Sequence, residues 1–305
     1  MPLRGAVAKA ERCASSKASS RLNVVTNPHA VFSQIQHWKQ AGLRVGLVPT
    51  MGALHAGHVS LVTQARQHCD CVATTIFVNP TQFGPNEDFT RYPRTLDADL
   101  ALLQQAGCDL VFTPTAADVY PQGCSTYVSP PAVSLTLEGE FRPEHFRGVA
   151  TVVLKLFMLL PATVAYFGQK DYQQCLVIRH MVEDLNVPIQ IQICPTVREI
   201  DGLAMSSRNR YLSPDQRRAA LCLWKALNVA QRMYVDGQSS IAHIEQQMQT
   251  HLLNEGADSI DYARIVDRET LASLTTPGGP AVALIAVRIG QTRLIDNLLL
   301  ENSLA

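Results

Sequence analysis

The sequence predicts an α/β fold: a doubly wound, Rossmann-like domain on a parallel sheet, followed by a smaller C-terminal α+β domain. Strand-like runs that are apolar throughout alternate with helical patterns over the first two thirds of the chain, which is typical of a parallel sheet covered on both faces. After Pro195 the pattern changes to two helices followed by three closely spaced strands. The length of 305 residues also fits two domains of roughly 150 residues each.

The first domain, residues 22–195, is expected to contain five strands. They are β-rich apolar runs at residues 44–48, 72–78, 109–112, 163–167 and 189–193. Helical patterns accompany them at residues 30–40, 59–68, 96–105, 149–160 and 173–185. Alternation of this kind predicts a doubly wound parallel sheet.

The second domain, residues 196–305, begins with helices. Ser213 and Pro214 mark a helix start, because serine caps free N–H groups and proline fits the first helical position. Apolar residues then recur at helical spacing, as Leu221, Trp224, Leu227 and Ala230 and, in a second helix, as Ile241, Ile244, Met248 and Leu252. Strand candidates at residues 261–266, 281–287 and 292–298 predict a small antiparallel sheet.

Charge and hydropathy exclude several classes of protein. The 26 Lys and Arg residues balance 26 Asp and Glu residues, whereas nucleic-acid binding and electrostatic membrane attachment depend on a basic surplus. The longest apolar stretch, residues 151–167, is interrupted by Lys155 and Pro161 and is short for a membrane span. We therefore expect a cytoplasmic protein that binds neither nucleic acid nor a membrane.

The eight cysteines are scattered over the chain, several of them in apolar runs. This distribution favours reduced thiols that pack as small apolar residues over a disulfide framework. Cys69 and Cys71 form the only close pair, and we interpret them as the entry to a strand, because no second pair completes a set of four metal ligands.

Residues 1–21 form an N-terminal extension rich in Ala, Ser, Lys and Arg. That composition is compatible with an organellar transit peptide. The alternative is a disordered extension or an early start codon. The lack of large apolar residues that could form one face of a helix favours this second interpretation.

Polar and glycine-bearing segments follow the predicted strands. They occupy residues 49–58, 79–83, 168–174 and 195–210. Ligands of open parallel sheets bind beyond the carboxyl ends of the strands, where these segments meet. The sequence therefore predicts an active site at this rim of the sheet.

His55 and His58 follow the first strand, close to Gly52 and Gly57. Glycine lets the backbone approach a ligand, and the helix that follows directs free N–H groups and the positive end of its dipole outward. Imidazoles there can donate hydrogen bonds to phosphate oxygens. A lone histidine would more often only cap the helix, but two histidines with flanking glycines predict a phosphate site. A zinc site is less supported, because no third ligand lies nearby.

The other rim segments are less specific. Residues 205–208 offer two hydroxyls and a guanidinium that suit outer phosphates, although such strings are commonly solvated loops. Lys170 and Asp171 fit either a salt-bridged turn or a phosphate-binding lysine beside an acid for ribose or metal. Gln82 and Gln174 suit the hydroxyls and carboxylate of a small substrate, or simply the surface. Because neither a P-loop nor a dinucleotide fingerprint occurs, any nucleotide is bound by another device.

Long stretches of the chain resemble the pantothenate synthetase (pantoate–β-alanine ligase) family. Within residues 22–300 they are PTMGALHAGH, FVNPTQF, YPRT, EGEFRPEHFRGVATVVLKL, YFGQKDYQQ, CPTVREIDGLAMSSRNRYL and RLIDN. The family belongs to a nucleotidyltransferase superfamily whose H-x-G-H element is here residues 55–58. One departure is Ala56, where many members have an acid, and we do not expect it to abolish activity.

The resemblance implies amide synthesis in two steps. The carboxylate of (R)-pantoate attacks the α-phosphorus of ATP, which gives pantoyl adenylate and pyrophosphate. The amine of β-alanine then attacks the acyl carbon, which releases pantothenate and AMP. Mg²⁺ accompanies ATP, no prosthetic group or protein-held metal is implied, and a homodimer is expected. Because water destroys the adenylate, the C-terminal domain is expected to act as a lid.

The resemblance also implies site residues. His58 is the catalytic residue, which we interpret as a hydrogen-bond donor to the α-phosphate, because the first step requires no proton transfer. Gln82 is shared by pantoate and β-alanine, and Gln174 holds pantoate. Contacts with ATP are implied for Met51, Gly52, Ala53, Leu54, His55, Ala56, Gly57, His58, Gly168, Gln169, Lys170, Asp171, Val197, Met205, Ser206, Ser207 and Arg208.

Three further residues have open roles. Arg142 and His145 lie in a stretch typical of the family, and Asp99 is a weak candidate for holding magnesium. Two amides, in place of arginines, are expected to keep the carboxylate of pantoate nucleophilic. Three competing functions remain: a nucleotidyltransferase that stops after adenylylation, a class I aminoacyl-tRNA synthetase, and an ATP-binding regulatory module without activity.

Overall fold

A computed structural model of the protein describes residues 22–300, except for residues 86 and 238. The expectations for the N-terminal extension, residues 1–21, lie outside the described residues. Within the described part, none of the helices has the length and apolar character needed to cross a membrane.

Six parallel strands form the larger sheet, in the spatial order β1-β4-β3-β2-β5-β6. They are β1 (Asn23–Val25), β2 (Val45–Thr50), β3 (Cys71–Ile76), β4 (Leu110–Phe112), β5 (Val164–Gly168) and β6 (Gln190–Cys194). The predicted parallel sheet is confirmed, and Cys71 does open a strand. The sheet has one strand more than expected, because β1 is a three-residue edge strand paired only with β4.

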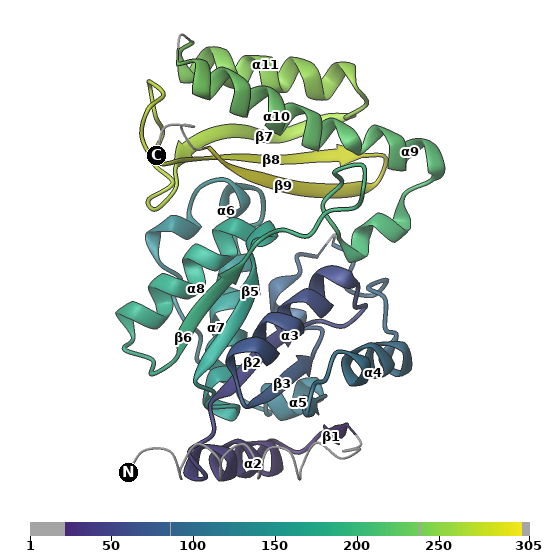
Figure 1. Ribbon diagram of the computed structural model, residues 1–305, viewed down its shortest axis with the longest axis vertical. Coiled ribbons are helices and arrows are strands. Elements are labelled where there is room, and N and C mark those ends of the chain that lie inside the picture. The colour runs from purple at the N-terminus through teal and green to yellow at the C-terminus, as the bar shows by residue number, and fades with distance from the viewer. Residues whose placement is uncertain (1–21, 86, 238, 301–305) are drawn as a thin grey trace.

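Helices cover both faces of this sheet (Figure 1). The longer ones are α2 (Pro28–Gln40), α3 (Ala56–His68), α4 (Leu96–Gln105), α7 (His145–Leu159) and α8 (Tyr172–Asp184). Short turns are α5 (Ala116–Val119), α6 (Glu138–Phe141), η1 (Pro80–Gln82), η2 (Ala132–Ser134), η3 (Gln169–Asp171) and η4 (Ser207–Tyr211). Residues of α3 and α4 share one apolar core, and residues of α2, α7 and α8 share the other. This is the doubly wound arrangement that the sequence predicts.

The C-terminal part contains α9 (Pro214–Ala219), α10 (Leu221–Asp236) and α11 (Ile241–Asn254), followed by β7 (Ser259–Asp267), β8 (Ala281–Ile289) and β9 (Thr292–Leu300). Ser213 caps α9 as expected, since its hydroxyl accepts the backbone N–H of Gln216. The three strands are antiparallel in the order β7-β8-β9, which confirms the predicted small sheet.

Strand β8 is buried on both of its faces. Ala283, Ile285 and Val287 pack with α10 and α11, whereas Val282, Leu284 and Ala286 belong to the core formed with α7 and α8. Successive side chains of a strand point to opposite faces, so this alternation places the small sheet between two apolar layers. In Figure 1 the small sheet accordingly lies between the helices α10 and α11 and the larger domain.

The order of the parallel strands reverses between β2 and β5. Chain order β2, β3, β4 runs toward one edge of the sheet, while β5 and β6 run toward the other. Loops that leave neighbouring strands at such a switch point diverge and create a crevice. The segment containing His55 and His58 follows β2, and Lys170 follows β5, so the topology brings both to this crevice.

Candidate active site

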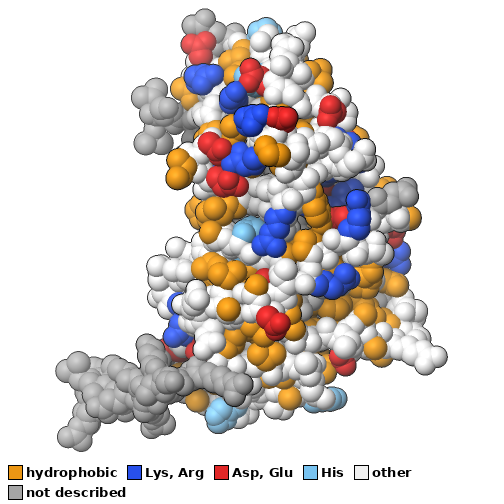
Figure 2. Space-filling model, turned by 90° about the vertical axis from the view of Figure 1, so that its right-hand side faces the viewer, with side chains coloured by type: hydrophobic (Ala, Val, Ile, Leu, Met, Phe, Trp, Pro, Cys, Tyr) orange, Lys and Arg blue, Asp and Glu red, His pale blue; other side chains and the backbone are white. Residues whose placement is uncertain are grey.

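A cleft of about 1160 Å³ opens between the carboxyl edge of the parallel sheet and the small antiparallel sheet. Lys and Arg side chains lie across the middle of the face drawn in Figure 2, beside a histidine. Most of the predicted site residues line the cleft: Met51, His55, Gly57, His58, Gln82, Gly168, Lys170, Asp171, Gln174, Val197, Met205, Ser206, Ser207 and Arg208. Five predicted residues are absent from its lining, namely Gly52, Ala53, Leu54, Ala56 and Gln169.

Asp99 holds the backbone of the loop that precedes His55. This carboxylate is 1% exposed and accepts the N–H groups of Ala53 at 2.9 Å and of Leu54 at 2.8 Å. Thr95 donates its hydroxyl at 3.1 Å. Both carboxylate oxygens therefore bind protein donors, and Asp99 lies outside the cleft lining. The suggestion that Asp99 holds magnesium is wrong, because its oxygens hold the loop backbone.

We expect Asp99→Ala to lower the free energy of unfolding by about 2–4 kcal/mol, because each buried N–H left without an acceptor costs ~1–3 kcal/mol. Urea unfolding measures the change, and the loss should be equal in EDTA and in Mg²⁺. The matched control is Asp97→Ala on the same helix, where the exposed side chain predicts a loss below about 1 kcal/mol. A loss at Asp99 no larger than that of the control would contradict this bracing role.

The two histidines share one hydrogen-bonded arrangement at the start of α3. His55 Nδ1 accepts the N–H of Gly57 at 3.1 Å, and His58 Nδ1 accepts the N–H of His55 at 3.3 Å. A Cβ on Gly57 would lie 2.9 Å from the His55 ring, so this contact requires glycine. In a neutral imidazole whose Nδ1 accepts, the proton resides on Nε2. His55 does cap the helix, and both rings are left with an Nε2–H as donor.

Both rings are uncharged at neutral pH. Burial lowers the pKa of His58 to about 3, and the neighbouring His55, Lys170 and Arg210 add to the effect. Burial likewise lowers the pKa of His55 to about 4, assisted by Lys170 and Arg210. The ring centroids are 4.1 Å apart. The pair therefore offers two neighbouring neutral donors.

Gln82 ends η1 and is 9% exposed. Its Oε1 accepts from Asn79 Nδ2 at 3.1 Å, and its Nε2 donates to the Met51 sulfur at 3.1 Å. The turn lies tightly against α7, since a Cβ on Gly148 would be 2.3 Å from the Thr81 carbonyl oxygen. Asn79 thus fixes the orientation of the Gln82 amide, so that the NH₂ group of Gln82 lies on the side of Met51. This NH₂ group can donate to an anionic substrate.

Adjacent glutamines at the start of α8 differ in their surroundings. Gln173 is 3% exposed, accepts the N–H of Glu138 at 3.0 Å and donates to the carbonyls of Val133 and Thr136. The side chain of Gln174 lines the cleft and has no hydrogen-bond partner among the described residues. Gln173 is therefore a structural brace, and Gln174 is available to a ligand.

The segment from Met205 to Tyr211 reaches across the cleft to the larger domain. Arg208 pairs with Asp88 through Nε at 3.2 Å and Nη2 at 3.1 Å, and the Ser207 hydroxyl lies 3.3 Å from that of Tyr92. Ser206 caps η4 by accepting the N–H of Arg208. The arginine expected to bind phosphate thus has a carboxylate partner in this structure.

Further hydrogen bonds join residues of the C-terminal part to the rim. Asn297 of β9 donates to the carbonyls of Gln169 at 3.0 Å and of Lys170 at 2.8 Å. Arg210 donates to the carbonyl of Leu54 at 3.2 Å, directly before the histidine pair. The side chain of Gln169 in turn donates to Asn297 Oδ1 at 3.4 Å. Strand β9 therefore holds the backbone of Gln169 and Lys170 at the rim of the cleft.

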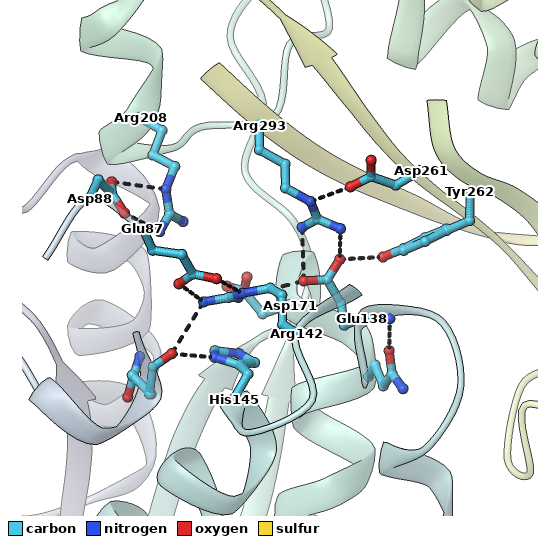
Figure 3. Close-up of polar contacts among 12 residues, drawn as sticks. Glu87, Asp88, Glu138, Arg142, His145, Asp171, Arg208, Asp261, Tyr262 and Arg293 are labelled. Carbon is cyan, nitrogen blue, oxygen red and sulfur yellow. Dashed lines mark hydrogen bonds and ion pairs between the residues drawn. The ribbon is translucent and has the colours of Figure 1, made fainter. Parts of the chain in front are cut away.

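A buried charge network closes the other end of the cleft (Figure 3). Glu138 accepts from both terminal nitrogens of Arg293 at 2.6 and 2.9 Å and from the Tyr262 hydroxyl at 2.8 Å. Arg142 lies 3.5 Å from Glu138 and pairs with both oxygens of Glu87 at 2.6 Å. Burial alone would raise the pKa of Glu138, but the hydrogen bonds and charge of Arg293 hold it at about 2.

Sequence reasoning missed most of this network. Glu138 and Arg142 stand four residues apart, which is the one local signal that pairs them. Arg293 lies 155 residues from Glu138, so no local pattern connects the two. Asp88 and Glu87 occur in a stretch whose polar composition resembles that of an ordinary loop.

Comparison with known proteins relates the chain to one family. Residues 23–299 match the family model described as pantoate-β-alanine ligase. A pantothenate synthetase of Rhodopirellula baltica is 52% identical over 90% of this chain and 98% of its own. The crystal structure of pantothenate synthetase from Thermus thermophilus has a TM-score of 0.85 and 44% identity over 91% of this chain and 99% of its own. A pantoate-β-alanine ligase from Francisella tularensis, complexed with β-γ ATP and β-alanine, has a TM-score of 0.78 and 34% identity over 93% and 99%.

Proposed function

Since the chain belongs to the pantoate–β-alanine ligase family, we propose that its cleft performs both steps of the ATP-dependent condensation of pantoate with β-alanine. The observation that carries the proposal is the juxtaposition of two neutral Nε2–H donors with the amide of Gln82 along one cleft at the switch point of the sheet. The donors suit phosphate oxygens, and the amide suits a carboxylate that must remain nucleophilic.

In the first step the carboxylate of (R)-pantoate attacks the α-phosphorus of ATP. We assign Gln82 and Gln174 to pantoate, because both side chains line the cleft as uncharged groups. Arg142 is nearby, but Glu87 and Glu138 neutralise its charge. Among the residues that the structure describes, the groups assigned to the carboxylate are therefore amides, and the guanidinium of Arg142 is paired. The lone pairs of the carboxylate thus stay available for attack.

The histidine pair acts on the phosphate. Negative charge grows on the α-phosphate oxygens as the new P–O bond forms, and donors that are already oriented stabilise it without reorganisation. Since the pKa of His58 is about 3, its ring cannot deliver a proton near pH 7. We therefore assign His58 as a neutral donor to the α-phosphate, with His55 beside it.

The remaining ATP contacts follow the predicted list. Lys170, Ser206 and Ser207 line the cleft, which supports a role at the outer phosphates. Arg208 is proposed to exchange Asp88 for phosphate when ATP binds. Among the residues that the structure describes, no group of three or more His, Cys, Asp or Glu side chains could hold a metal ion. Mg²⁺ is therefore proposed to arrive with the ATP phosphates, whose charge it neutralises when bound.

In the second step the amine of β-alanine attacks the acyl carbon of the adenylate, and AMP leaves. Water has to be excluded in between. The assignment of residues 196–305 as a lid remains a proposal, and the contacts of Ser207 and Arg208 across the cleft support closure by the 205–211 segment. Homodimerisation and a cytoplasmic location also stay predictions.

The test of this function is pantoate-dependent ATP–pyrophosphate exchange, followed by β-alanine-dependent release of AMP. Exchange without any response to β-alanine would indicate a nucleotidyltransferase that stops after adenylylation. The absence of both reactions in folded protein would refute the proposal.

The two glutamines should separate the two steps. We expect Gln174→Ala to raise the KM for pantoate and to slow exchange, because the carboxylate is no longer aligned. Gln82→Ala should do the same and should also slow the reaction of β-alanine with preformed adenylate. Single-turnover measurements on both variants check this. If both variants consume β-alanine from preformed adenylate at equal rates, the shared role of Gln82 is refuted. If the activation free energy in either variant changes by less than about 0.5 kcal/mol, the substituted residue lies outside the site.

A further inference from the structure

His145 carries its proton on the opposite ring nitrogen from His55 and His58. It is the first residue of α7, and its Nδ1 lies 2.9 Å from the carbonyl oxygen of Gln82. A carbonyl oxygen can only accept, so Nδ1 holds the hydrogen and Nε2 holds a lone pair. Backbone contacts thus make His55 and His58 donors, and the same kind of contact makes His145 an acceptor.

The side chain of His145 has one ring nitrogen without a protein partner in the described part of the chain. The residue lines the cleft and is half-buried. Its Nε2 has no hydrogen-bond partner among the described residues, and it is not among their buried polar atoms that lack a partner. The nitrogen is therefore open to a ligand at a fixed place beside Gln82, the residue assigned to both pantoate and β-alanine.

The carboxylates of Glu87 and Glu138, which lie nearby, are engaged. Glu87 pairs with Arg142, and Glu138 pairs with Arg293 and Tyr262. Arg142 itself donates to the Gln82 carbonyl at 3.3 Å, so it lies next to His145 without occupying Nε2. Burial and the charge of Arg142 lower the pKa of His145 to about 4, so the acceptor is unprotonated at neutral pH.

The second step requires such an acceptor. When the amine nitrogen bonds to the acyl carbon, it carries a positive charge and must lose one hydrogen before the amide is complete. The C–N bond forms, the bond between the acyl carbon and the phosphate oxygen breaks, and that oxygen leaves with AMP. The N–H becomes strongly acidic as the C–O bond breaks, so even a weakly basic imidazole can remove its proton.

We propose that Nε2 of His145 accepts a hydrogen bond from the attacking amine of β-alanine and takes its proton as the C–N bond forms. The proton then passes to solvent, which returns the ring to its neutral state. This inference rests on the proposed function and assigns His145 as the catalytic residue of the second step, while His58 acts in the first.

The test measures how fast two nucleophiles, β-alanine and hydroxylamine, react with preformed pantoyl adenylate in the wild-type protein and in His145→Asn. The Asn amide can still donate to the Gln82 carbonyl, but it offers no acceptor at the position of Nε2. Hydroxylamine is the second nucleophile, because it is far less basic than β-alanine and its adduct loses a proton to water readily. We expect the ratio of the β-alanine rate to the hydroxylamine rate to fall at least ~100-fold, the lower range for losing a general base. The matched control is His37→Asn, the same substitution at an exposed position outside the cleft lining, and its ratio should stay within ~3-fold of wild type.

A second variant covers the possibility that His145→Asn does not fold. Imidazole added to His145→Ala should accelerate the β-alanine step at least ~10-fold and leave the hydroxylamine reaction unchanged. Equal losses for both nucleophiles, an unchanged ratio, or no rescue by imidazole would overturn the role of His145. If the wild-type protein forms no adenylate, the proposed function itself fails, which is a separate and recognisable result.

Discussion

We expect His58→Ala to slow pantoate-dependent ATP–pyrophosphate exchange by about a hundred- to a thousandfold, the usual cost of removing one oriented donor from a developing negative charge. The fold should be retained, because His58 Nδ1 accepts only the backbone N–H of His55. The matched variant is His58→Gln, whose terminal NH₂ can reach the place of Nε2–H, and it should keep more activity than the alanine variant. Near wild-type exchange in folded His58→Ala would refute the assignment.

The pH dependence distinguishes a neutral donor from an acid. With a pKa of about 3, His58 is uncharged in the free protein at neutral pH. If imidazolium were required, kcat/KM for ATP would fall as the pH rises above that value. We expect instead that wild type and His58→Gln show the same profile between about pH 5.5 and 8, because neither donor changes its ionisation there. Loss of activity on raising the pH in wild type alone would identify an acid.

A large effect on stability is also expected at Glu138. We expect Glu138→Ala to lower the free energy of unfolding by about 3 kcal/mol, the lower end for breaking a buried ion pair, since Arg293 keeps Asp261 as a partner at 2.6 Å. The control is Glu269→Ala, where the half-exposed pair with Arg179 predicts a loss below about 1 kcal/mol. Urea unfolding measures both, and equal losses would contradict the importance of the network.

Low pH should remove the stabilisation that the ionised carboxylate of Glu138 gives to the fold. The pKa of Glu138 is about 2 in the folded protein, against 4.5 for the unperturbed group. A depressed pKa stabilises the folded state above the unfolded value, and the contribution is lost as the pH falls through the window between them. The difference in unfolding free energy between wild type and Glu138→Gln should therefore be constant above about pH 5 and shrink below pH 4.5. At pH 3, about one unit above the pKa of Glu138 in the folded protein, the difference should already be smaller than at neutral pH. A difference that stays constant down to pH 3 would refute the dependence of stability on this ionisation.

The layers of the fold could be predicted because β2, β3 and β5 are buried, β-rich runs that alternate with helical patterns. β1 could not, since its three residues, Asn23–Val25, carry no pattern of their own and become a strand only beside β4. The start of α7 at His145 was also missed, because its first turn contains few apolar residues. The periodicity of apolar residues marks only the buried part of a helix, so a polar first turn cannot be predicted from it.

The site was predictable as far as it depends on the switch point of the sheet. The loops after β2 and β5 have to meet there, which placed His55, His58 and Lys170 in one cleft. Asp99 was misjudged as a magnesium candidate, because only the folded loop brings two N–H groups to its carboxylate. The tautomers were equally hidden, since they follow from backbone contacts that a sequence does not display.

The two-faced burial of β8 also determines how the protein can move. Swinging the small sheet away from the larger domain would expose Val282, Leu284 and Ala286 to water together with the side chains packed on them. The seam that can part without such exposure is the polar one, where Arg208 meets Asp88 and Ser207 meets Tyr92. We therefore expect the chain to melt as a single cooperative unit. We also expect the movement that admits substrates to be confined to residues 205–211 of the proposed lid, where only polar contacts have to separate.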